Sequence, residues 1–189
     1  MRSSLRRAVS ATAAVLSVGS LAAFGTTSVA AADTPSVSTS AQALVDITCT
    51  LGVQVTKFNP GLTFVPQQVD FTVSGTLGGC VSLTNPQIVG GTFSGAGQGV
   101  LSCTAGSSTS RNTIRWNTGQ SSVVESEFVV NVKPDGTTVL VSEGSVVGGL
   151  FQGSTVVQTR ALPNTDLTAC AEPGGLQATS GAVTTTILL

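Results

Sequence analysis

The chain has 189 residues, of which 41% are hydrophobic and only 9% are charged, and its formal net charge is −1. This composition excludes an intrinsically disordered chain, which combines low hydrophobicity with high net charge, and the eight Lys and Arg residues are too few for the basic face that nucleic-acid binding requires. Histidine is absent, which excludes Ser-His-Asp and Cys-His catalysis and histidine-ligated metals.

The N-terminal segment has the three parts of a cleavable secretory signal. Three arginines lie within the first seven residues, an uncharged apolar run covers residues 8–24, and small residues follow at 28–32. The run is shorter and more polar than a transmembrane helix. We therefore expect a signal peptide over residues 1–31, no membrane insertion of the mature chain, and a protein that is secreted to the extracellular space or associated with the cell envelope. The mature chain keeps five cations and nine acids, for a net charge of −4.

The domain that follows is expected to consist of β-strands. After a flexible N-terminal tail, residues 32–42, hydrophobic and polar residues alternate with the period of two that is typical of strands. No window has the 3.6-residue period of a long helix. The predicted strands are residues 48–57, 68–77, 88–94, 100–103, 113–116, 124–132, 137–143, 151–159 and 182–188.

Turn residues separate these strands. Lys133-Pro134-Asp135-Gly136 predicts a hairpin, and residues 104–110 predict a mobile loop. Glycine clusters, such as those within residues 90–99, are either turns or bulges inside strands. Many short strands with this spacing are typical of a sandwich or a barrel. We expect a single antiparallel β-sandwich over residues 43–189, Ig-like or jelly-roll-like, with about seven to ten strands.

Four cysteines in an exported chain predict two disulfides, for which three pairings exist. If the first two predicted strands form a hairpin centred near position 63 or 64, Cys49 lies opposite Cys80. This favours the pairs Cys49–Cys80 and Cys103–Cys170. A zinc site made of cysteines is not expected, because no Cys-x-x-Cys spacing is present.

No catalytic, cofactor-binding or metal-binding residue is predicted, and no cofactor is expected. Three aromatic side chains are candidates for ligand contact. Trp116 could stack on a sugar or anchor an interface, although we expect it to pack in the core. Phe58 and Phe64 flank a Pro-Gly turn and would form a contact patch if they were exposed.

The sequence favours a non-enzymatic extracellular binding or structural module that contacts a protein or a polysaccharide. Its oligomeric state is left open. One alternative is a protease inhibitor that uses residues 104–110 as a loop braced by the Cys103 disulfide. The other is a glycoside hydrolase that uses Glu125 and Glu127, which share one face of a strand. Few aromatic residues are present to hold a sugar, so we expect these two acids to be solvated.

Three segments resemble small exported proteins of actinobacteria, a group without an assigned activity. They are Phe58-Asn59-Pro60-Gly61-Leu62, residues 115–122 and residues 144–153. The resemblance implies a secreted, disulfide-bonded β domain and assigns no catalytic residue.

Overall fold

The computed structural model describes residues 44–132, 138–162 and 167–189. Three predicted segments lie outside the described residues: the signal peptide (1–31), the N-terminal tail (32–42) and the turn at 133–136. Residue 43, the first of the predicted domain, also lies outside them. The described part contains eight strands: β1 (Val45–Leu62), β2 (Gln67–Ser82), β3 (Gly90–Leu101), β4 (Gly106–Trp116), β5 (Ser121–Val132), β6 (Thr138–Gly149), β7 (Thr155–Leu162) and β8 (Leu176–Leu188).

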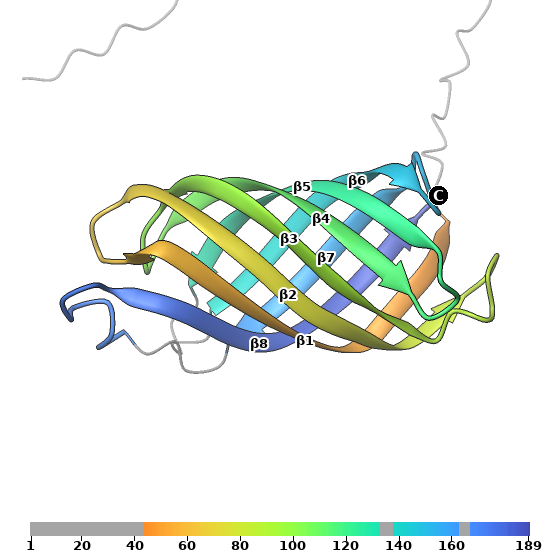
Figure 1. Ribbon diagram of the computed structural model, residues 1–189, viewed down its shortest axis with the longest axis horizontal. Helices are drawn as coiled ribbons and strands as arrows, with labels where there is room; N and C mark the ends of the chain where they lie inside the picture. Colours follow the sequence, from red (N-terminus) through yellow and green to blue (C-terminus); the bar gives the residue numbers. More distant parts are fainter. Residues whose placement is uncertain (1–43, 133–137, 163–166) are drawn as a thin grey trace, which may run out of the picture. The chain divides into compact units, whose positions relative to one another are not determined.

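The eight strands form one closed antiparallel barrel. Each strand pairs with the next along the chain, and β8 pairs with β1 (Figure 1). The prediction of a β-sandwich is therefore wrong. A sandwich has two sheets with free edges, whereas here β1 has partners on both sides, β2 and β8. Closure removes the edge strands of the sheet.

Glycines inside strands explain why short strands were expected. The predicted strands 88–94 and 100–103 are parts of one strand, β3, whose middle contains Gly95, Gly97 and Gly99. These glycines face the interior, and a Cβ atom at Gly97 would clash with the ring of Phe71. Glycine therefore allows neighbouring strands and core rings to approach closely, which a strongly coiled barrel requires.

The predicted loop at residues 104–110 is also wrong. Residues 106–110 belong to β4 and pair with β3, where Leu101 lies opposite Gly106. Only residues 102–105 form the turn, which is closed by a hydrogen bond from the Ser102 N–H to the Ala105 carbonyl oxygen, 2.8 Å long. Serine and threonine on alternating positions suit a strand with one face toward the interior.

Both predicted disulfides are confirmed. Cys49 and Cys80 are direct partners in the β1–β2 ladder, and Cys103 in the β3–β4 turn is bonded to Cys170 in the segment before β8. The bonds close segments of 31 and 67 residues. In the loop-entropy model each stabilises the fold by roughly 4 kcal/mol.

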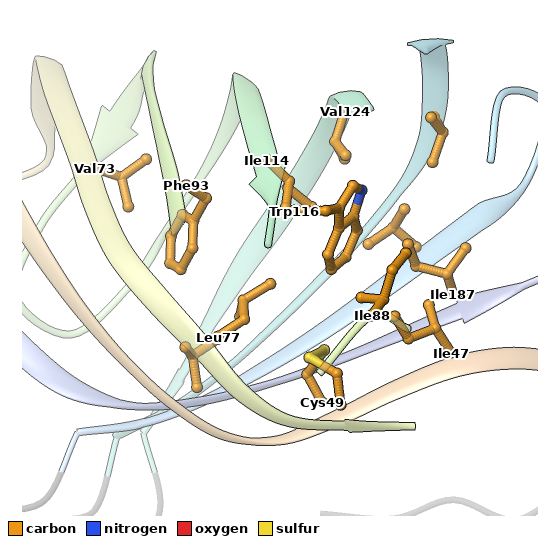
Figure 2. Packing of buried hydrophobic residues seen from close by; sticks show 14 residues of the cluster. Ile47, Cys49, Val73, Leu77, Ile88, Phe93, Ile114, Trp116, Val124 and Ile187 are labelled. Atoms are coloured by element: carbon orange, nitrogen blue, oxygen red, sulfur yellow. A yellow bond between two sulfur atoms is a disulfide. The ribbon is translucent and has the colours of Figure 1, made fainter. Parts of the chain in front are cut away.

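The interior is layered along the barrel axis. One end, which we call the closed end, carries the β2–β3, β4–β5 and β6–β7 connections. There, hydrophobic side chains from the surrounding strands fill the interior, with Trp116 above Ile88 of the β2–β3 connection (Figure 2). The other end, the cavity end, has a second apolar cluster that includes Phe71, Phe128 and Leu140.

A polar belt separates the two apolar clusters. Its side chains are all buried and come from six strands. They are Gln54, Ser108, Ser110, Asn112, Ser126, Ser142, Gln158, Arg160 and Thr185. Buried polar groups are costly unless they find hydrogen-bond partners, and four side-chain atoms of this belt have none.

Candidate functional site

A cavity lies between the polar belt and the apolar cluster of the cavity end. Its volume is about 60 Å³. A single water needs roughly 10–15 Å³, so the space holds several waters or a few ligand atoms. Aromatic and aliphatic side chains form most of its wall, and Gln54, Thr56, Ser102, Arg160 and Thr179 supply the polar groups.

The partly exposed wall of the cavity lies along β8. β7 has only 8 residues, and its ladder with β8 ends at Ala161 and Ala182. β8 continues to Leu176, and in this stretch its ladder among the described residues is with β1 alone. Thr179 and Gly181 lie in this stretch, line the cavity and are partly exposed.

Arg160 is the charged side chain of the cavity. The alternation along β7 turns Val156, Gln158 and Arg160 inward, and Arg160 is only 7% exposed. Its Nη2 donates a hydrogen bond of 3.1 Å to Gln158 Oε1, and its guanidinium lies 5.9 Å from the centre of the Phe128 ring. The Nε–H group is buried and has no hydrogen-bond partner. Arg160 is thus held in place while part of its donor capacity is unused.

No carboxylate of the described residues pairs with Arg160. The ion pair found among them, Arg111 with Glu125, lies on the outer surface. Burial lowers the pKa of Arg160 to about 10, because desolvation disfavours the charged form. The side chain is still protonated at neutral pH. The cavity therefore contains a positive charge that an apolar wall does not compensate.

Other polar atoms of the belt also lack partners. They are Gln54 Oε1, Ser108 Oγ and Asn112 Oδ1. Gln54 uses its amide nitrogen to donate to Thr56 Oγ1 at 2.9 Å, and Gln158 Nε2 donates to Thr185 Oγ1 at 3.0 Å. Buried polar atoms in folded proteins are nearly always hydrogen-bonded, so exceptions indicate bound water or a ligand.

The structure places the three aromatic candidates in different environments. Phe58 is half-buried, lines the cavity and lies 6.4 Å from the ring of Phe71. Phe64 is 48% exposed in the β1–β2 connection and is not part of the cavity wall. Trp116 is buried at the closed end, where its Nε1 donates to Ser122 Oγ at 2.9 Å and its ring packs edge-on against Phe151.

The two candidate carboxylates lie outside the barrel. Glu125 and Glu127 are exposed on β5 and border an open depression of the outer surface. Glu125 pairs with Arg111, whereas Glu127 lies opposite another acid, Glu143 of β6. Neither carboxylate faces the interior cavity.

Sequence reasoning missed Arg160. The predicted strand 151–159 ended one residue before it, although the alternation of Val156 and Gln158 continues to Arg160. Val156 and Val157 are adjacent in the sequence, so a period of two does not show which face of this strand is inside. The inward direction of Arg160 follows only from the structure.

No protein-family model matches this chain, and no curated protein is significantly similar to it. Among the described residues, no helix is long and apolar enough to cross a membrane. Within the same residues, no three His, Cys, Asp or Glu side chains come together as a group that could hold a metal ion.

Proposed function

We propose that this protein is an exported, non-enzymatic binding module that holds a small ligand inside the cavity end of its barrel. The observation that carries the proposal is the interior cavity, in which apolar walls surround a few polar groups with unused hydrogen-bonding capacity. An eight-stranded barrel is just wide enough to be filled by side chains or to hold one small ligand. Binding sites for small molecules typically combine apolar walls with a few placed polar groups.

Export is supported by two independent features. The first 31 residues have the charge and hydropathy pattern of a secretory signal. The two disulfides of the barrel are consistent with an oxidising environment, where such bonds persist. A ligand would then be taken up outside the cytoplasm.

The alternatives receive no support from a specific feature. Residues 106–110 of the segment expected to serve as an inhibitory loop are part of β4. The carboxylates expected to serve a hydrolase are on an open outer surface, and one of them is paired with Arg111.

The proposal is tested with the mature chain and two probes of equal length, octan-1-ol and octanoate, by saturation-transfer NMR. Thr179→Trp places a large ring in the partly exposed wall of the cavity, and Ala178→Trp places the same ring at the neighbouring exposed position as a matched control. We expect transfer to at least one probe with the wild type and with Ala178→Trp, and its loss with Thr179→Trp. Absence of transfer to both probes, or equal transfer with both variants, would contradict the proposal.

A further inference from the structure

We infer that the ligand of the cavity is an amphipathic monocarboxylate whose anionic group binds Arg160. The inference rests on the proposed function, because it specifies the chemistry of the ligand that the cavity takes. Its starting point is a buried cation whose guanidinium has, among the described residues, one side-chain hydrogen bond, one cation–π contact and an unpartnered Nε–H group.

A buried charge without a counter-ion is expensive, and chains rarely keep one without a use for it. Within the described part of the chain, the neighbours of Arg160 are neutral: Gln158 on its own strand, its ladder partners Leu140 and Val183, and the ring of Phe128. An anion in the cavity would accept hydrogen bonds from the guanidinium and offset its desolvation. Carboxylate and phosphate are the groups whose geometry the planar arginine fork matches.

The charge balance favours a monoanion. Among the described residues that line the cavity, Arg160 is the one cation and none is an acid. One carboxylate neutralises one guanidinium, whereas a phosphate dianion would leave a net negative charge in the same apolar surroundings. The remaining polar wall is neutral and does not supply a second positive charge.

The side chains that line the cavity indicate that the rest of the ligand is apolar. Phe58, Phe71, Phe128, Leu140, Leu162 and Leu176 line the space around Arg160. They offer dispersion and hydrophobic contacts but no further hydrogen bonds from their side chains. The volume of about 60 Å³ accommodates the carboxylate and a few carbons. A longer chain would extend along the partly exposed side chains of Phe58 and Leu162.

The test measures the affinities of octanoate and octan-1-ol by calorimetry at pH 7 for the mature wild type, Arg160→Met and Arg160→Lys. Charged hydrogen bonds are worth about 1.5–3 kcal/mol, which corresponds to about 10–100-fold in affinity. We expect the wild type to prefer octanoate by this factor. Arg160→Met should abolish the preference while the affinity for octan-1-ol stays within about 3-fold, and Arg160→Lys should recover part of it.

The outcomes separate the inference from the proposed function. Binding of both probes without a preference for octanoate, or a preference that survives in Arg160→Met, overturns the inference and leaves the binding module standing. Binding of neither probe overturns both. A double variant, Asp135→Asn with Asp166→Asn, tests two acids outside the described residues as counter-ions. Higher octanoate affinity in this variant would show that one of these acids already neutralises Arg160 in the wild type and would overturn the uncompensated cation on which the inference rests, whereas an unchanged affinity supports it.

Discussion

The two ends of the barrel treat a buried charge in opposite ways. At the closed end, Asp46 is only 1% exposed. Its carboxylate accepts hydrogen bonds from Ser82 Oγ at 3.2 Å, from the Thr84 N–H at 2.9 Å and from Thr84 Oγ1 at 2.6 Å. At the cavity end, Arg160 donates one hydrogen bond and has an unpartnered Nε–H. The fold supplies hydrogen-bond donors for the carboxylate of Asp46, whereas the Nε–H of Arg160 has no acceptor among the described residues.

The pKa shifts of the two groups follow from this difference. Burial raises the pKa of Asp46, but the hydrogen bonds from Thr84, Ser82 and Leu83 together bring it below its ordinary value of 3.8. The pKa of Arg160 falls to about 10 through burial alone. Hydrogen bonds to the charged form thus outweigh desolvation at the closed end, and nothing within the described part of the chain does so at the cavity end. At the closed end the fold itself satisfies the buried charge, whereas at the cavity end the described residues leave the buried charge without a counter-ion.

The largest expected effect concerns the packing of the closed end. Trp116→Ala removes a buried ring that contacts Phe151 and donates to Ser122. We expect the free energy of unfolding to fall by about 3–5 kcal/mol in urea titrations followed by circular dichroism. Trp116→Phe, which keeps a ring, should cost less. A loss below about 1 kcal/mol for Trp116→Ala, or a large change in octanoate affinity of the folded variant, would contradict the division between the two ends.

Replacing Arg160, the buried charge of the cavity end, should raise the free energy of unfolding instead of lowering it. Arg160→Met keeps much of the side-chain volume and removes an uncompensated charge, so we expect the ligand-free protein to gain about 1–3 kcal/mol in urea titrations. Arg160→Lys, which keeps the charge, is the control and should not gain stability. A destabilised Arg160→Met variant would show that Arg160 is a structural element like Asp46, and the contrast between the ends would fail.

Removing the closed-end charge should destabilise the protein moderately. In Asp46→Asn an amide nitrogen cannot accept the bond from Thr84 Oγ1, and we expect a loss of about 1–2 kcal/mol at pH 7. The loss depends on pH. Because the folded pKa of Asp46 lies below 3.8, its stabilisation is present above that pH and disappears as the pH falls through the folded pKa.

The measurement for Asp46 is a comparison of unfolding free energies of wild type and Asp46→Asn between pH 7 and pH 2.5. The difference should be constant above about pH 5 and should shrink below pH 3.8. A difference that grows as the pH falls would contradict the assignment of the hydrogen bonds to the charged carboxylate.

Local patterns predicted the features that depend on near neighbours. The register of the first hairpin placed Cys49 opposite Cys80, and this left Cys103 for Cys170. The period of two predicted a domain of β-strands without a long helix, which the structure confirms for the described residues. These inferences needed only alternation and one hairpin centre, because a strand pair joined by a short turn has its register fixed by that turn.

The closure of the barrel and its cavity depend on contacts between residues far apart in the sequence, which local patterns do not reveal. Alternation says which face of β1 is buried, but not that β8 will pair with its free edge. The glycines of β3 were ambiguous, since the same residue type permits a turn, a bulge or close packing inside a strand. Arg160 became a candidate only when closure brought Phe128 and Leu140 around it.

The smallest effects are expected on the outer surface. Glu125 and Arg111 have side chains that are 51% and 64% exposed, so Glu125→Gln should lower stability by less than about 0.5 kcal/mol, and added salt should reduce the effect. Glu127→Gln is the matched control, because Glu127 faces the like charge of Glu143 and its removal should be neutral or slightly stabilising. Octanoate affinity should be the same in both variants, since neither side chain lines the interior cavity. A change of more than about 3-fold in either variant, measured by calorimetry, would place the ligand on the outer face of β5 instead of beside Arg160.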